Sequence, residues 1–195
     1  MLHILFVCTG NTCRSPMAEG LLRKLAKERG IDVEVRSAGV SAISGTPLSR
    51  HAAAILRDEG IHDHILSTQL SGETVAWADL VLTLTGGHKS HLLQYFPEAV
   101  AKTYTLKEYV YDEEAVNADI RELDSLYADA ELSLALGAEP KSADLQRIIE
   151  IRQRIPSFDI SDPFGGPRED YELAAAEIRT ALYSLLDKLE SLRRL

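Results

Sequence analysis

The sequence predicts an α/β fold, a single-domain three-layer sandwich in which a central parallel sheet of about four strands is flanked by helices. Two observations lead to this class. Apolar runs of strand length alternate with stretches whose apolar residues recur every three or four positions, which is typical of strands alternating with helices. The run at 2–7 is almost continuously apolar, as expected for a strand covered on both faces of a parallel sheet.

The helix after the strand at 2–7 has clear start and stop signals. Ser15 precedes Pro16, a hydroxyl cap followed by proline at the first helical position, and Gly30 ends the helix. The other expected elements are a strand over 33–36, a helix over 46–59, a strand over 79–84, a helix over 88–96, a strand over 103–106 and a long amphipathic helix over 171–192.

One acidic segment carries most of the net charge. The chain has 195 residues, which suits a single domain over 1–195, and its formal net charge is −9. Residues 112–150 hold eleven acidic and three basic residues. Apolar residues at helical spacing on both sides of a break at 137–140 predict a helical hairpin inserted at 112–157. Its default interpretation is a solvated surface. The alternatives are a lid or a docking surface for a basic protein partner.

Composition and charge exclude several classes of protein. The negative net charge argues against binding to nucleic acid or to an anionic membrane. No apolar run reaches the roughly 20 residues that a membrane span needs, and the N-terminus lacks the pattern of a signal peptide. The only cysteines, Cys8 and Cys13, are five positions apart, which predicts a chemical role in a reducing cytoplasm.

The residues after the first strand form a candidate phosphate site. The chain continues as Cys8-Thr9-Gly10-Asn11-Thr12-Cys13-Arg14-Ser15 and then enters a helix. Backbone amides of a loop that leads into a helix N-terminus bind anions, and Arg14 adds a bidentate clamp. The same positive field favours the thiolate of Cys8, a nucleophile directed at phosphorus. The alternative interpretation is a buried cysteine at the end of a strand beside a surface arginine. It does not explain the turn residues Gly10, Asn11 and Thr12, which have no packing role.

Residues 7–19 resemble the signature of the low-molecular-weight protein tyrosine phosphatases. Two other segments match landmarks of that family, Ser37-Ala38-Gly39 and Asp162-Pro163-Phe164-Gly165-Gly166. The resemblance extends over residues 1–110 and 158–195. It implies a cysteine-dependent phosphatase that acts on phosphorylated proteins and needs no cofactor or metal.

The resemblance also implies roles for individual residues. Cys8 attacks phosphorus, while Arg14 and the loop amides stabilise the transition state. Asp162 protonates the leaving group and then activates water; Asp159 is the competing acid, but only Asp162 has the matching Asp-Pro context. Supporting and phosphate-binding roles fall to Thr9, Gly10, Asn11 in a strained turn, Thr12, Cys13, Ser15 as hydrogen-bond donor to Cys8, Phe164, and Ser37 as the brace of Asn11.

Three features bear on the substrate. Thr12 stands where tyrosine-directed members usually have a larger aliphatic residue, no paired tyrosines follow Asp162, and Ser41-Ala42-Ile43 offers no aromatic ring. Thr12 and the Asp-Pro-Phe-Gly-Gly run resemble the protein arginine phosphatase branch. We therefore expect phosphoarginine as the substrate, with phosphotyrosine as the alternative. Arsenate reductase activity and a non-catalytic phosphate-binding module are less favoured hypotheses.

Cys13 and the histidines each allow two interpretations. Cys13 is either a small buried residue or the partner that traps oxidised Cys8 as a disulfide. His62 and His64 alternate, and His88 and His91 are spaced by about one helical turn, so either pair could contact a metal. With no cysteine cluster or acidic third ligand beside them, we expect surface histidines and no metal site.

Overall fold

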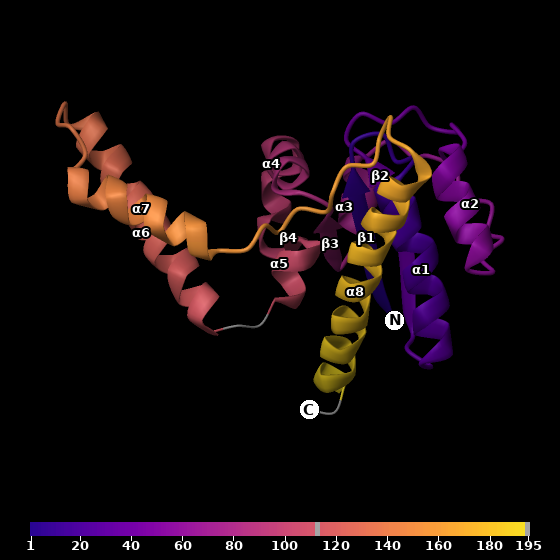
Figure 1. Cartoon of the computed structure of the whole chain (residues 1–195). Coiled ribbons are helices and arrows are strands. Elements are labelled where there is room, and N and C mark those ends of the chain that lie inside the picture. Colours follow the sequence, from indigo (N-terminus) through magenta and orange to yellow (C-terminus); the bar gives the residue numbers. More distant parts are fainter. Residues whose placement is uncertain (112–113, 194–195) are drawn as a thin grey trace. The chain divides into compact units, whose positions relative to one another are not determined.

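The computed structural model describes residues 1–111 and 114–193, and the chain forms two compact units. The first unit comprises residues 1–110 and 158–195, and the second comprises residues 111–157. Both units are drawn in Figure 1. Within the described residues, no helix is both long enough and apolar enough to cross a membrane.

A four-stranded parallel sheet forms the centre of the first unit, which confirms the predicted fold class. The strands lie in the order β2-β1-β3-β4. Cys8, the last residue of β1, is in register with Gly39, the last residue of β2. The strands are β1 Leu2–Cys8, β2 Val33–Gly39, β3 Leu80–Thr83 and β4 Thr103–Thr105.

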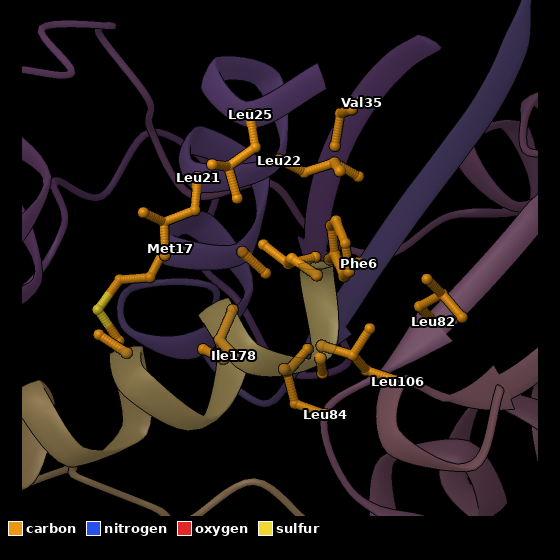
Figure 2. Close-up of a cluster of buried hydrophobic side chains, with 14 of the residues drawn as sticks. Phe6, Met17, Leu21, Leu22, Leu25, Val35, Leu82, Leu84, Leu106 and Ile178 are labelled. Carbon is orange, nitrogen blue, oxygen red and sulfur yellow. The ribbon is translucent and has the colours of Figure 1, made fainter. Parts of the chain in front are cut away.

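Helices cover both faces of the sheet. Successive side chains of β1 point to opposite faces, and the apolar residues on each face pack against helices. Ile4 and Phe6 belong to one buried cluster together with residues of α1 (Arg14–Glu28) and α8 (Arg168–Arg193). Figure 2 shows Phe6 in this cluster with Leu22 of α1 and Ile178 of α8. Leu5 and Val7 belong to the second cluster, which includes residues of α3 (Gly72–Trp77), α4 (Gly86–Tyr95) and the 3₁₀ helix Pro97–Lys102. The sheet is therefore the middle of three layers.

Two predicted helix starts were wrong. α1 begins at Arg14, so Ser15 lies inside its first turn, and its hydroxyl contacts Cys8 instead of capping the helix. Pro16 is tolerated there because the amides of the first turn need no intrahelical partner. α2 (Arg50–Asp58) begins four residues later than 46, because the side chain of Ser49 caps it by accepting a hydrogen bond from the Ala52 amide.

Several boundaries and short elements were not predicted. β2 extends three residues past the predicted end at 36, through Ser37 to Gly39. α3, the 3₁₀ helix and α5 (Leu106–Val110) have six, six and five residues, too few for a helical period to show in the sequence.

The second unit consists of a pair of helices, α6 (Glu114–Ala135) and α7 (Ser142–Arg154). Arg147 donates to Glu122 at 2.6 and 2.9 Å and Arg154 donates to Asp119 at 2.8 Å, so ion pairs join the two helices. Gly137, between them, has a φ of 74°. Both helices lie within residues 112–157, for which the sequence predicts an inserted helical hairpin; the insertion itself stays a prediction, and residues 112–113 lie outside the described part of the chain.

Candidate active site

The loop 9–13 lies at the carboxyl edge of the sheet, between β1 and α1. β1 is a central strand with β2 on one side and β3 on the other. In an open parallel sheet, such a point, where successive connections leave in opposite directions, is the usual place for a ligand.

Two carbonyl groups at the start of this loop accept hydrogen bonds from the segment that follows β2. The Cys8 carbonyl accepts from the Val40 amide at 3.0 Å, and the Thr9 carbonyl accepts from the Ser41 amide at 2.9 Å. The described peptide bonds are all trans, and in a trans peptide the next N–H points opposite to the carbonyl. The amides of Thr9 and Gly10 therefore point away from the segment after β2, which leaves them free to donate to a bound anion.

Two residues shape the loop. Asn11 is fully buried with a φ of 51°, a left-handed conformation that asparagine tolerates better than most residues. Its Oδ1 accepts a hydrogen bond from the Thr68 amide at 2.7 Å, which holds the turn in place. Gly39 makes room for the loop, because a Cβ at this position would collide with the backbone oxygen of Thr9.

A chain of buried hydrogen bonds runs from Cys8 into the protein. The Asn11 amide nitrogen donates to the hydroxyls of Ser15 and Ser37, each at 2.8 Å. Ser15 Oγ accepts from Asn11, lies 2.9 Å from the Cys8 sulfur, and also lies 3.5 Å from the Ala38 carbonyl, to which it can donate. Ser37 in turn donates to Glu19. This chain of hydrogen bonds places a hydroxyl group within hydrogen-bond distance of the Cys8 sulfur.

Glu19 ends this chain, and the sequence pattern had predicted no role for it. Its carboxylate is buried and pairs with Arg23 at 2.5 Å. Burial raises its pKa above the usual 4.5, opposed by the Ser37 hydrogen bond and the charge of Arg23. A glutamate one turn into an amphipathic helix resembles any surface acid in sequence, so only the packing reveals its position.

Arg14 connects the loop to the segment that carries Asp162. Its side chain is buried, with the residue only 5% exposed. Nη1 donates to the Ile160 carbonyl at 3.2 Å, and Nη2 lies 3.0 Å from the Asp162 carboxylate. The Asp162 side chain is more than half exposed, and its other oxygen accepts from the Phe164 amide at 3.1 Å. The structure thus brings the predicted clamp and the predicted acid together.

Asp159 is bonded elsewhere. Its carboxylate accepts a hydrogen bond from the Gly86 amide at the N-terminus of α4, at 2.8 Å. Lys107 donates to the Asp159 carbonyl at 2.8 Å and pairs with Glu177 at 2.5 Å, which anchors the segment. Of the two candidate acids, only Asp162 is among the residues that line the pocket.

A pocket of about 230 Å³ opens above the loop. The predicted site residues divide into two groups. Asn11, Ser15 and Ser37 are buried behind the loop and support it. Phe164 is 78% exposed, an aromatic ring at the rim. The residues that line the pocket are Cys8, Thr9, Gly10, Thr12, Cys13, Arg14, Asp162 and Phe164.

Cys13 is a buried free thiol, as is Cys8. Its sulfur lies 3.5 Å from the Ser49 hydroxyl and 3.6 Å from the Tyr171 hydroxyl. Burial raises the pKa of Tyr171, and its hydrogen bond to Cys13 raises it further. Cys13 therefore lines the pocket while its sulfur sits among hydroxyl groups.

The expectation that the histidines lie at the surface was wrong for His88. His62 and His64 are exposed, but His88 is 7% exposed and lies against the loop. Its Nε2 is 2.9 Å from Thr9 Oγ1, and burial lowers its pKa to about 4, with a smaller contribution from Arg14. Periodicity alone missed it because His88 is in the first turn of a short helix, where a helical stripe is not yet defined.

Comparisons with known proteins identify the family of the chain. The profile of the low molecular weight phosphotyrosine protein phosphatase family matches residues 3–132. A protein-arginine-phosphatase of Geobacillus stearothermophilus is 37% identical over 189 residues, covering 97% of each chain. Another, from Bacillus subtilis, is 45% identical over 109 residues, covering 56% of this chain and 73% of its own.

Solved structures give the same result. The YwlE arginine phosphatase from Geobacillus stearothermophilus has a TM-score of 0.71 at 37% identity, covering 99% of this chain and 96% of its own. A mutant YwlE arginine phosphatase with a phosphorylated active-site serine has a TM-score of 0.73 at 32% identity, covering 99% of both chains. The matched profile spans more than half of this sequence and includes the loop that carries Cys8 and Arg14. The chain belongs to the low molecular weight phosphotyrosine protein phosphatase family.

Proposed function

We propose that the chain is a protein arginine phosphatase that hydrolyses phosphoarginine in proteins. The observation that carries this substrate is Thr12, a polar residue in the pocket wall beside Cys8. Its hydroxyl can hydrogen-bond a guanidino leaving group, whereas an aliphatic side chain at this position cannot. Two aligned relatives that are named protein-arginine-phosphatase support the same assignment.

In the first step, the Cys8 thiolate attacks phosphorus opposite the leaving nitrogen. A sulfur–phosphorus bond forms and the phosphorus–nitrogen bond breaks, with its electron pair passing to the guanidino nitrogen. Asp162, in its acid form, protonates that nitrogen. The loop amides and Arg14 stabilise the charge on the phosphoryl oxygens. The product of this step is arginine together with a cysteinyl-phosphate.

In the second step, water replaces the sulfur. Asp162, now a carboxylate, takes a proton from the water as its oxygen bonds to phosphorus. The sulfur–phosphorus bond breaks and its electrons return to Cys8, where the Ser15 hydroxyl, 2.9 Å away, stabilises the thiolate. Inorganic phosphate leaves, and Cys8 and Asp162 return to their starting forms.

A comparison of substrates tests the proposal. The rates of phosphate release from peptides that differ only in carrying phosphoarginine or phosphotyrosine are measured side by side. We expect kcat/KM to be higher for the phosphoarginine peptide. A preference for phosphotyrosine would make that residue the substrate, and the Phe164 ring at the rim would suit it as a stacking surface.

Two further outcomes would change the reaction class. Reduction of arsenate in the presence of a thiol would make the chain an arsenate reductase. Phosphate binding without turnover of either peptide would make it a non-catalytic phosphate-binding module. The presence of Cys8, Arg14 and Asp162 around one pocket argues against that second outcome, because all three parts of the hydrolytic chemistry are in place.

The proposal includes a redox response in a reducing cytoplasm. Peroxide oxidises the Cys8 thiolate to a sulfenic acid, the Cys13 thiol attacks that sulfur, and water leaves as a disulfide forms. The two thiols border one pocket, which supports this pairing. Mass spectrometry after mild peroxide treatment tests it. Sulfinic acid on Cys8 without a bridged peptide would exclude the pairing.

For the hairpin of α6 and α7 we propose a docking role towards a basic protein partner. The hairpin combines acidic side chains with exposed apolar ones, among them Leu132, Leu136 and Ile149. Reversing exposed charges, as in Asp129→Lys with Glu131→Lys, should slow turnover of a phosphorylated protein while leaving p-nitrophenyl phosphate unaffected. If the variant matches the wild type on both substrates, the hairpin has no docking role and is a solvated surface.

A further inference from the structure

His88 joins the phosphate loop to the start of α4. Its imidazole is buried, with Nε2 2.9 Å from the hydroxyl of Thr9 and Nδ1 3.0 Å from the hydroxyl of Thr85. Thr9 follows the nucleophile directly and lines the pocket, whereas Thr85 is the N-cap of α4. One ring thus connects the loop after β1 to the helix after β3.

The directions of these hydrogen bonds depend on the tautomer of the ring, and we assign the tautomer in which the Thr85 hydroxyl is the donor. Thr85 Oγ1 already accepts a hydrogen bond from the His88 backbone amide at 3.2 Å, so its hydrogen is available to donate to Nδ1. Nδ1 is then an acceptor, and in a neutral imidazole the remaining hydrogen is on Nε2. Nε2–H therefore donates to Thr9 Oγ1. Burial favours the neutral ring, because it lowers the pKa of His88 to about 4.

We infer that His88 is a positioning residue that turns the Thr9 hydroxyl into a hydrogen-bond donor for a phosphoryl oxygen in the pocket. Because Thr9 Oγ1 accepts from His88, its own hydrogen points away from the ring. Thr9 is exposed and lines the pocket, so this hydrogen can reach a bound anion. A hydrogen bond to a charged oxygen is stronger than one between neutral groups.

The inference rests on the proposed phosphate chemistry of the pocket but is independent of the leaving group. It also differs from a purely structural role. A histidine that only stabilised α4 would change thermal stability and leave anion affinity unchanged. A histidine that orients Thr9 would act on anion affinity only while the Thr9 hydroxyl is present.

Double-mutant analysis separates these roles. The proteins are the wild type, His88→Phe, Thr9→Val and the combination of the two. His88→Gln supplies an amide donor, and Thr9→Ser keeps the hydroxyl. His91→Phe is the matched control, since His91 lies on the same helix and stacks on Tyr95 at 5.2 Å. Affinity for inorganic phosphate is measured by calorimetry, and kcat and KM with p-nitrophenyl phosphate.

We expect His88→Phe and Thr9→Val each to weaken phosphate binding about tenfold, the loss of one hydrogen bond to a charged group. The double variant should be no weaker than the weaker single variant. His88→Gln and Thr9→Ser should recover most of the affinity, and His91→Phe should match the wild type. Thermal unfolding of each variant checks that it is folded.

Three results would overturn the inference. In the first, the two losses multiply in the double variant. In the second, His88→Phe lowers the melting temperature but leaves phosphate affinity unchanged. In the third, the wild type does not bind phosphate. A wild type that binds phosphate with these dependences but does not hydrolyse phosphoarginine would refute the proposed substrate and leave the role of His88 intact.

Discussion

Arg14 and Asp162 form an ion pair at the pocket, with the guanidinium Nη2 3.0 Å from the carboxylate Oδ2. The group proposed to bind phosphoryl oxygens therefore also positions the group proposed to protonate the leaving atom. Arg14 additionally donates to the carbonyl of Ile160, so the segment that carries the acid is fixed to the phosphate loop. One buried side chain therefore serves both phosphoryl binding and the placement of the proton donor.

Asp162→Asn should remove the proton donor while keeping the size of the side chain. We expect kcat on the phosphoarginine peptide to fall by about 10² to 10⁴, the usual contribution of general acid–base catalysis. The matched control is Asp159→Asn, whose carboxylate accepts from the Gly86 amide and does not line the pocket. Steady-state kinetics on both variants provides the test. Equal losses would show that Asp162 has no special role.

Thr12→Ile should change selectivity more than catalysis. We expect kcat/KM for phosphoarginine to fall roughly tenfold or more relative to phosphotyrosine, because a leaving group that hydrogen-bonds the hydroxyl loses its partner. Thr12→Ser, which keeps the hydroxyl, should retain the wild-type ratio. Parallel rates on matched peptides provide the readout. If the Ile variant keeps the wild-type ratio of kcat/KM values for the two peptides, Thr12 does not determine the substrate.

Much of this architecture is visible in the sequence because its signals are local. The apolar run of β1 and the loop from Cys8 to Ser15 are contiguous, and a contiguous pattern can be interpreted directly. The start of α1 was misplaced because Ser15 resembles a cap in sequence, yet its hydroxyl is used by Cys8 and Asn11. A hydroxyl with two possible partners cannot be assigned without tertiary contacts.

Glu19 and His88 were missed for a related reason. Both act through residues distant in sequence, since Glu19 accepts from Ser37 of β2 and His88 contacts Thr9 after β1. Their burial results from the packing of helices on the sheet, and helix periodicity does not report it. Supporting residues whose partners are distant in sequence can be identified only from the structure.

Glu19→Gln should alter the pH dependence of stability. Because burial raises the pKa of Glu19 above 4.5, the folded state binds a proton more tightly than the unfolded state. The wild-type free energy of unfolding therefore loses a contribution as pH rises from about 4.5 through the folded-state pKa. Glutamine does not titrate, so the variant should gain stability relative to the wild type across this window. Urea unfolding of both proteins at a series of pH values measures the difference. A constant difference would contradict the raised pKa.

His88 should remain neutral in mildly acidic solution. Its pKa in the folded protein is about 4, lowered from 6.5 chiefly by burial. Between these values the unfolded state binds more protons, so the contribution of His88 to stability is present above pH 6.5 and is lost as pH falls towards 4. The charged and titratable groups that also act on the ring are Arg14, Asp162, Asp159 and His91. NMR titration of the imidazole shifts checks the value, and a midpoint near 6.5 would contradict a buried neutral ring.

Rapid quenching followed by mass spectrometry tests the nucleophile most directly. The wild-type enzyme is mixed with a phosphoarginine peptide, quenched within a single turnover and digested. We predict a phosphoryl group on the peptide that contains Cys8, and none when Cys8→Ala is treated in the same way. Phosphate release without any label on Cys8, or release that persists in the Cys8→Ala variant, would contradict the account.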